Sequence, residues 1–217
     1  MALSFKDSSV TKRVKRFTER PKPLLSKSKE NLLSLRQKEA IAGLEDLIKD
    51  GYPQLTMAQI ATKLKVSLRT LYEIAPRKEE LLLIAVDRLL FKIGALAQKA
   101  INTNDGPLIK LKIFLHKTHE ATTNNALAFT EDFNKIRGAR ELIDSHENYV
   151  VNITEQLLND AIKAGEINKI DSSWVALLLS GLTRETNRKY LKKESKAVPI
   201  SSAEEMWEII FKGLKNN

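Results

Sequence analysis

Three neighbouring residues of the segment HKTHE have side chains suited to metal chemistry: His116, His119 and Glu120. In a helix they would lie on adjoining turns, and His146 is the chain's other histidine. Zinc proteases use H-E-x-x-H, with the glutamate between two histidines, and the order here differs. A solvated helix face is the favoured interpretation and a regulatory metal site the alternative. Because no Gly-rich phosphate loop or serine triad is present either, we expect no enzymatic activity, no cofactor and no metal.

A second group of residues suits contacts with an anionic partner. The stretch VSLRTLYEIAPRK, residues 66–78, carries Arg69, Tyr72 and Lys78. A guanidinium can donate two hydrogen bonds to the O6 and N7 atoms of guanine. Taken singly, however, Tyr72 would be a half-buried core aromatic, and the two cations would be ordinary solvated charges. The elements that position these residues therefore decide between the two interpretations.

Length and composition indicate a folded protein with one core, or with a small module joined to a larger one. The chain has 217 residues, of which 42% are hydrophobic. No apolar run approaches the roughly 18 residues of a membrane span, and the opening MALSFKDSSV does not resemble a secretory signal, so we expect a cytoplasmic location and no membrane partner. The absence of cysteine excludes disulfides, thiol nucleophiles and cysteine-ligated zinc.

The excess positive charge lies at the beginning of the chain. Residues 1–36 contain ten Lys or Arg against three Asp or Glu, a net of +7, whereas residues 37–91 contain eight of each. We interpret residues 1–33 as a basic tail whose commonest partner would be an anionic polymer. A membrane surface is less favoured, because the apolar residues form no long amphipathic stripe. Our hypothesis is that the tail follows a DNA backbone or enters a minor groove.

The pattern after the tail predicts three short helices in a helix-turn-helix arrangement. Apolar residues recur at helical spacing over 35–50, Thr56 with Gln59 forms a capping box for a second helix, and Ser67 caps a third that ends before Pro76. A fourth helix is expected from Arg77. The side chains expected to point inward are Ile60, Ala61, Leu64, Leu71 and Ile74. In such an arrangement the outer face of the last helix enters the major groove of DNA.

The order of residues over 56–82, TMAQIATKLKVSLRTLYEIAPRKEELL, resembles the DNA-binding signature of the TetR family of bacterial transcriptional regulators. The match has no gaps over this segment, the first predicted helix with Gly51 and Tyr52 before the segment fits the same pattern, and the resemblance covers roughly a quarter of the chain. Two positions depart from the family pattern: Lys65 stands where glycine is usual in the turn, and Glu73 opens a stretch in which aromatic residues or histidine are common. Glu73 would also repel a phosphate.

The resemblance implies a set of DNA contacts. Thr56 and Met57 would face phosphates at the start of the second helix, and Tyr72 and Lys78 would bind phosphates too. Arg69 would read a base edge, while Leu68 and Thr70 could touch a thymine methyl or a phosphate. The complete expected set is Thr56, Met57, Ser67, Leu68, Arg69, Thr70, Tyr72, Arg77 and Lys78.

The remaining residues continue as helices, so the predicted class is all-α. Helices are expected from Pro107, around ALAFTEDFNKI, from ARELIDSHE to Gly165, after Asp171, and after Ser202, which forms a capping box with Glu205. The segment SSWVALLLSGLT is apolar on nearly every side, and the last helix carries a stripe of apolar residues with Trp207 and Phe211 at its edge. We expect a dimer interface rather than a purely internal core, made by Trp174, Leu178, Met206, Ile209 and Ile210.

The predicted organisation is a basic tail (1–33), a helix-turn-helix head (34–82) and a larger helical module for dimerisation and effector binding (83–217). In the family such a module encloses a small-molecule pocket. The aromatic residues that could line it are Phe114, Phe129, Phe133, Tyr149 and Trp174, although a core role is favoured for them. The effector residues are unknown. The predicted function is a homodimeric repressor that a small-molecule effector releases from a palindromic operator in double-stranded DNA. The alternative is an architectural, nucleoid-associated DNA binder without a ligand.

Overall fold

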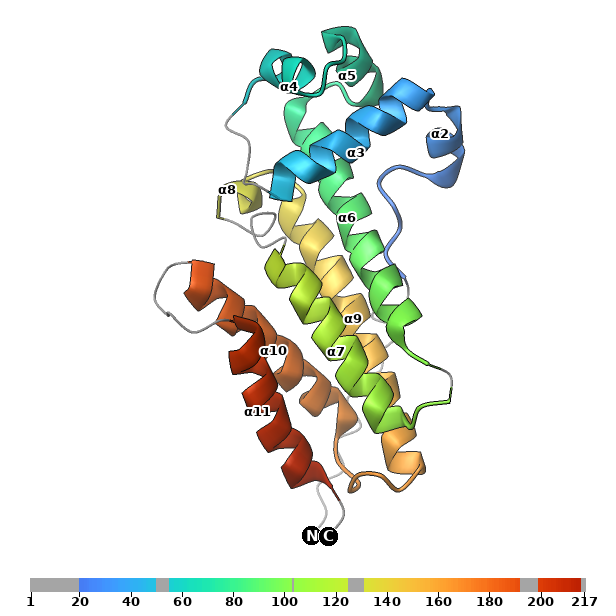
Figure 1. Cartoon of the computed structure of the whole chain (residues 1–217), viewed down its shortest axis with the longest axis vertical. Helices are drawn as coiled ribbons and strands as arrows, with labels where there is room; N and C mark the ends of the chain where they lie inside the picture. The colour runs from blue at the N-terminus through green and yellow to red at the C-terminus, as the bar shows by residue number, and fades with distance from the viewer. Residues whose placement is uncertain (1–19, 50–54, 103, 125–130, 192–198, 216–217) are drawn as a thin grey trace, which may run out of the picture.

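The chain folds into helices, as predicted. The computed structural model describes residues 20–49, 55–102, 104–124, 131–191 and 199–215, and Figure 1 shows these segments in colour. Within them β-structure is limited to one isolated bridge between Ile167 and Lys215. None of the helices in the described segments has the length and apolar character needed to cross a bilayer. The all-α class is confirmed.

Helices α3 (Leu35–Lys49), α4 (Met57–Lys63) and α5 (Leu68–Ile74) form one end of the elongated molecule (Figure 1). The predicted caps are present. The Thr56 hydroxyl accepts from the backbone N–H of Gln59, and the Gln59 side chain accepts in return from the backbone N–H of Thr56. Ser67 caps α5 by accepting from the backbone N–H of Thr70. These local hydrogen bonds fix where both helices begin.

The turn between α4 and α5 contains a residue in the left-handed region. Lys65 has φ 54°. Side chains with a Cβ atom rarely adopt this conformation, which explains why glycine is usual here in the resembled family. On the other side of the turn, α3 comes close to Leu64, since a Cβ atom added to Gly43 would lie 2.8 Å from its Cδ2 atom.

Helix α6 (Lys78–Ala100) carries the core of the head into the body. A single cluster of buried residues joins α3, α4 and α5 to Leu81 and Ile93 on α6, to Phe133 on α8 (Glu131–Asn134) and to Ile143 on α9 (Ala139–Lys163). The division expected at residue 82 therefore falls inside α6 and inside this cluster. The head and α6 share one core in the described residues.

Part of the expected basic tail packs against α6 instead. Residues 27–32 form helix α2 (Lys27–Leu32), and Pro21 and Leu25 before it are buried. The backbone N–H of Leu24 donates to Oδ2 of Asp87 at 2.8 Å. Residues 20–33 thus contact α6, because the burial of a few apolar residues depends on α6 rather than on the local charge, and the assignment of residues 1–33 as a tail remains a prediction. Residues 1–19, with the densest charge, lie outside the described residues.

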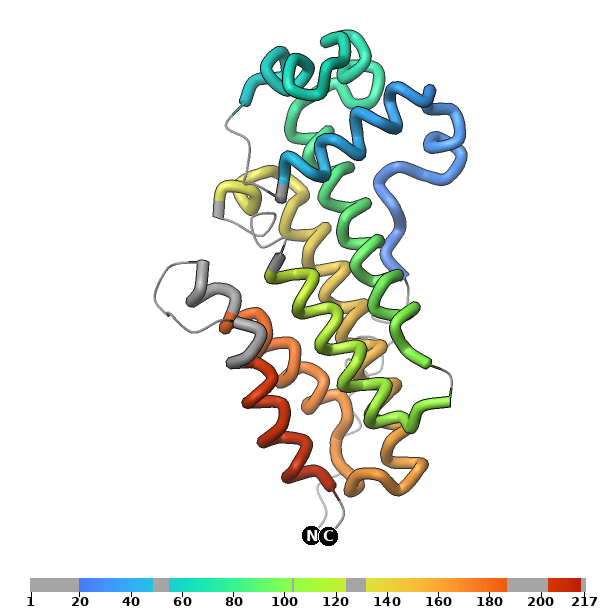
Figure 2. The backbone as a smooth tube through the Cα atoms, in the orientation of Figure 1, coloured from blue at the N-terminus to red at the C-terminus, as the bar shows by residue number. Residues whose placement is uncertain are grey.

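The body contains α7 (Pro107–Asn124), α9, α10 (Ser172–Leu191) and α11 (Pro199–Leu214). In Figures 1 and 2, α10 and α11 run side by side along one flank of the body, and the two helices are in contact. A second buried cluster fills the space among these four helices; its large members include Leu111, Leu158, Leu179, Trp207 and Phe211. The body therefore has its own core.

Most of the predicted helix ends in the body are confirmed. α7 begins at Pro107, Gly165 follows α9 with φ 70°, and Asp171 Oδ1 accepts from the backbone N–H groups of Ser173 and Trp174. Hydrogen bonds from Ser173 and Trp174 lower the pKa of the Asp171 carboxyl. The start of the last helix was placed too late, because α11 begins at Pro199 and already contains Ser202.

Candidate nucleic-acid interface

The outer face of α5 presents three of the predicted DNA-contacting side chains to solvent. The Arg69 side chain is 88% exposed, Tyr72 is 50% exposed, and Leu68 is exposed beside them. Leu71 on the opposite side of the same helix is fully buried. Tyr72 is thus a surface residue and not a core aromatic. The exposed side of the short helix carries one cation, one phenol, one aliphatic group and the carboxylate of Glu73.

At the start of α4, the two residues predicted to face phosphates differ in exposure. Thr56 is exposed, while Met57 is 9% exposed and belongs to the core cluster of the head. The Met57 side chain therefore does not face a phosphate, because it packs beneath the helix. Only the backbone of Met57, in the first turn of α4, could meet an anion.

Ser67 and Thr70 hold the start of α5 together. Their hydroxyl oxygens lie 2.7 Å apart, and the backbone N–H of Thr70 donates to Ser67 Oγ at 3.0 Å. Both hydroxyls are therefore engaged within the protein. The methyl group of Thr70 is the part of this side chain that takes no part in hydrogen bonding.

Arg69 is tied to the only acidic residue of α5. Its Nε atom donates to Glu73 Oε1 at 2.9 Å, and Glu73 Oε2 accepts from Nε2 of Gln37 on α3 at 3.2 Å. Gln37 is not among the residues predicted from the sequence. A signal was present, because Ser34 and Gln37 have the same spacing as Thr56 and Gln59 and form the same reciprocal hydrogen bonds.

Two further predicted cations lie where α5 leads into α6. Arg77 is exposed at the N-cap position of α6, and Lys78 is half-buried as its first residue. Glu79 and Glu80 follow in the first turn and are exposed. These acids stabilise the helix start through its dipole but lower the positive potential of the surface beside α5.

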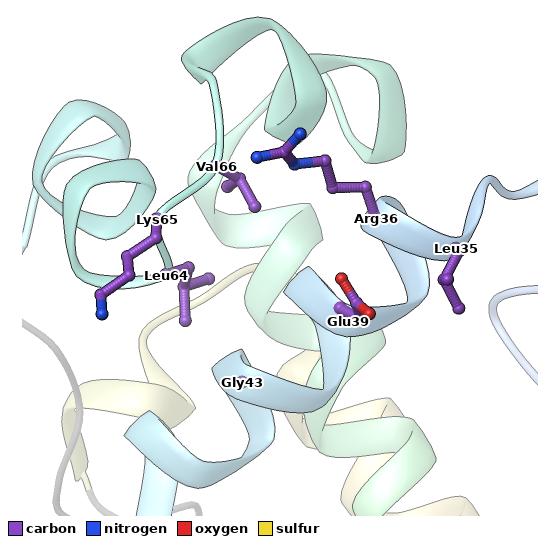
Figure 3. A pocket seen from close by; sticks show the side chains of 7 residues that line it. All are labelled: Leu35, Arg36, Glu39, Gly43, Leu64, Lys65 and Val66. Carbon is purple, nitrogen blue, oxygen red and sulfur yellow. The ribbon is translucent and has the colours of Figure 1, made fainter.

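An open hollow of about 450 Å³ lies between α3 and the turn that joins α4 to α5 (Figure 3). Its lining residues are Leu35, Arg36, Glu39, Gly43, Leu64, Lys65 and Val66. All seven belong to the head, so this hollow is not the effector pocket expected in the larger module.

Four of the five residues of the predicted dimer interface are exposed apolar side chains on α10 and α11. Trp174 and Ile209 are each 71% exposed, and Leu178 and Met206 are exposed as well. Ile210 is only partly exposed and packs against the core of the body. Trp207 and Phe211, which form the second apolar edge of the last helix, are buried within the same chain.

The histidine segment does not form a solvated helix face. His119 is 1% exposed and lies edge-on to Trp207, with ring centroids 5.5 Å apart, while Nδ1 of His116 contacts Glu204 on α11. A hydrogen bond from Lys117 lowers the pKa of the Glu120 carboxyl. The interpretation failed for His119 because α11, eighty residues later, covers it. Among the described residues no group of three or more acidic, histidine or cysteine side chains is arranged to hold a metal ion.

The aromatic residues considered for an effector pocket divide into different environments. Phe114 and Phe133 are buried in the core, as favoured, whereas Trp174 is exposed. The Tyr149 hydroxyl accepts a hydrogen bond from Nε2 of Gln98 at 3.1 Å. Phe129 lies outside the described residues. In the described part of the chain, these aromatic side chains therefore do not gather around one pocket.

The described residues thus define a helix-turn-helix head on a larger helical body. No protein-family model matches the sequence, and no curated protein has a significantly similar one. Solved structures do share the fold. A TetR transcription regulator from Haloarcula marismortui has a TM-score of 0.71 at 15% identity, covering 83% of this chain and 98% of its own.

Two further structures agree with that match. The transcriptional regulator FadR from Bacillus subtilis, solved in complex with stearoyl-CoA, has a TM-score of 0.68 at 19% identity, covering 82% of this chain and 98% of its own. FadR from Bacillus halodurans, a fatty acid degradation regulator, has a TM-score of 0.64 at 17% identity, with coverages of 82% and 99%. The chain has the fold of TetR-type transcriptional regulators, and the resemblance first seen in residues 56–82 is confirmed at the level of the fold.

Proposed function

We propose that the protein is a sequence-specific, DNA-binding regulator of transcription that acts in the cytoplasm, at the nucleoid. The observation that carries this proposal is the outward face of α5, where Arg69 and Tyr72 are exposed and Leu71 beneath them is buried. A helix held in this way can enter the major groove, which is about 12 Å wide. The fold shared with TetR-type regulators supports the proposal.

Within this function the exposed residues take different roles. Arg69 reads a guanine, and Leu68 and the Thr70 methyl group contact a thymine methyl. Tyr72 and Lys78 bind phosphates, which position the helix without reading sequence. The remaining proposed contacts are Thr56, the backbone of Met57, Ser67 and Arg77.

We further propose that two copies pair through α10 and α11. The exposed apolar side chains of Trp174, Leu178, Met206 and Ile209 support this, with partly buried Ile210 at the edge of the surface. Such a surface is costly to leave in water, and a second copy supplies a complementary apolar face. A two-fold dimer places two α5 helices in successive major grooves of a palindromic operator.

The proposed mode of regulation is repression that a small molecule relieves. The structure of Bacillus subtilis FadR is a complex with stearoyl-CoA, so this fold binds a small molecule in at least that protein. We place the effector site of this chain within residues 83–217. An effector releases DNA only if it binds more tightly to the arrangement of heads that does not fit the operator.

Selection of bound genomic fragments, followed by titration of the selected and random duplexes, tests the proposal. An operator-specific regulator is expected to prefer its site by about a thousandfold or more. Near-equal affinities would favour an architectural DNA binder instead, which the net charge of +7 on residues 1–36 would suit.

A further inference from the structure

Glu73 connects the exposed arginine of α5 to a different helix. One carboxylate oxygen, Oε1, accepts from Arg69 Nε at 2.9 Å, and the other, Oε2, accepts from Gln37 Nε2 at 3.2 Å. Arg69 and Glu73 are four residues apart on α5, and Gln37 lies on the first turn of α3. The Arg69 side chain is therefore held from one side although it is highly exposed.

Gln37 is itself held at both ends of its amide. The backbone N–H of Ser34 donates to its Oε1 at 2.8 Å, and its Nε2 donates to Glu73. The backbone N–H of Gln37 donates to Ser34 Oγ at 3.2 Å. The cap that starts α3 thus fixes the amide that holds Glu73, and the relay runs from Ser34 through Gln37 and Glu73 to Arg69.

The relay determines which donors of Arg69 face outward. A guanidinium has five N–H donors in one plane, and Glu73 occupies the one on Nε. The two terminal nitrogens have no partner among the described residues. This terminal edge can donate two parallel hydrogen bonds, which is the arrangement that guanine O6 and N7 accept.

We propose that Glu73 is a positioning residue that sets the base specificity of Arg69, and that Gln37 holds Glu73 in place. This inference rests on the DNA-binding function proposed above. An exposed ion pair four residues apart on a helix adds little to the free energy of unfolding, so fold stability alone does not explain the pair. Its consequence is that the long Arg69 side chain loses less freedom on binding a base.

Glu73 also carries a negative charge towards the phosphates, and this gives the proposal a distinctive signature. The charge weakens binding to every duplex, whereas the orientation of Arg69 strengthens binding to the correct base only. Removing the carboxylate should therefore raise the affinity for random DNA and lower the discrimination at one base pair. Substitution of a residue with a purely structural role would instead change the affinity for the selected duplex and the affinity for random DNA in the same direction.

The test is a double-mutant cycle on the full-length protein with the selected duplex, the same duplex carrying a substituted guanine, and random DNA. Arg69→Ala should reduce discrimination at one base pair about tenfold or more. Glu73→Ala should reduce it about threefold to tenfold, the scale of ordering one flexible side chain. In the Arg69→Ala background, Glu73→Ala should leave discrimination unchanged, because its effect passes through Arg69.

Matched variants separate orientation from charge. Glu73→Gln keeps an acceptor for Arg69 and should retain most of the discrimination, while its affinity for random DNA rises. Glu79→Ala removes a neighbouring exposed acid of α6 that does not touch Arg69, and it should leave discrimination unchanged. Gln37→Ala should lower discrimination more than Ser34→Ala, which weakens the same helix cap but leaves the amide that binds Glu73 in place.

The outcomes distinguish the inference from the function on which it rests. A wild-type protein that binds all duplexes equally would contradict both the positioning role of Glu73 and the sequence-specific function on which it rests. If the wild type is sequence-specific, two results would overturn the positioning role and leave the DNA-binding function standing. Either Glu73→Ala leaves the discrimination of the wild type unchanged, or it lowers discrimination by the same factor with and without Arg69. Thermal unfolding of each variant checks that the head remains folded.

Discussion

Asp87 on α6 and His146 on α9 are joined by a buried contact of 2.9 Å between Oδ1 and Nε2. The other oxygen of Asp87 accepts from the backbone N–H of Leu24 at 2.8 Å, and the carboxylate is 1% exposed. Phe91 lies edge-on to the His146 ring, with centroids 4.7 Å apart. One side chain therefore links the N-terminal segment, the helix that leaves the head, and the body.

Asp87→Ala should lower the free energy of unfolding by about 3 kcal/mol, because it leaves a buried imidazole and a backbone N–H without their acceptor. Urea denaturation measures the change. Asp160→Ala is the control: Asp160 is exposed and lies 3.5 Å from Lys163, and its loss should change the stability by less than about 0.5 kcal/mol. An Asp87→Ala protein as stable as the wild type would contradict the structural role of this contact.

Lys65→Gly should stabilise the head by about 0.5–1 kcal/mol, since φ 54° strains a residue with a Cβ atom and glycine adopts it freely. Lys65→Ala keeps the Cβ atom and should bring no gain. Lys63→Gly, at the end of α4, should instead cost about 0.5–1 kcal/mol in helix propensity. Denaturation midpoints compare the three variants, and equal effects of glycine at positions 63 and 65 would exclude the strain.

Arg69→Ala and Tyr72→Phe should affect DNA binding in different ways. Loss of Arg69 should cost about 1–3 kcal/mol at one base pair of the operator. Loss of the Tyr72 hydroxyl should weaken every duplex by about 1 kcal/mol, because a phosphate bond carries no sequence information. Titration of a panel of single-base variants distinguishes the two patterns. Tyr149→Phe, which removes a hydroxyl on α9, is the control and should leave binding unchanged.

Ile209→Asp should convert a dimer into a monomer, because a charge at a buried apolar contact is costly to desolvate. Sedimentation velocity at micromolar concentration reports the association state. Leu96→Asp is the matched control, since Leu96 is also an exposed apolar residue but lies on α6. A monomeric wild type, or an Ile209→Asp variant that still pairs, would reject the proposed interface.

Glu147 and Glu208 should respond to pH with opposite signs. Burial raises the pKa of Glu147 despite Arg184 at 3.4 Å, so its contribution to stability falls as pH rises from 4.5 towards the folded value. A hydrogen bond from Lys112 lowers the pKa of Glu208, so its contribution is present above pH 4.5 and is lost as pH falls through the folded value.

Glu147→Gln should therefore be more stable than the wild type at neutral pH, and Glu208→Gln less stable. Both differences should shrink as the wild-type carboxyls become protonated: that of Glu147→Gln as pH falls from the raised folded pKa to 4.5, and that of Glu208→Gln as pH falls from 4.5 to the lowered folded pKa. Urea midpoints measured from pH 8 down to below the lowered folded pKa of Glu208 give the two profiles. Shifts of the same sign would contradict the causes assigned to these pKa changes.

The chain itself encoded the features that depend on neighbours within one or two turns. Thr56 and Gln59 start α4, Ser67 starts α5, and Asp171 precedes α10, because each cap is a hydrogen bond between residues two or three positions apart. The same locality made the order of residues over 56–82 sufficient to predict the head and the outward position of Arg69.

Tertiary structure decided every feature that depends on distant partners. Met57 turns inward because α4 lies on the core of the head, and His119 is buried because α11 covers it. Gln37 meets Glu73 across 36 residues, and Asp87 meets His146 across 59. Local patterns specify where helices start and which faces are apolar; the burial of a polar group is set by whichever helix packs against it, and that is determined only when the whole chain has folded.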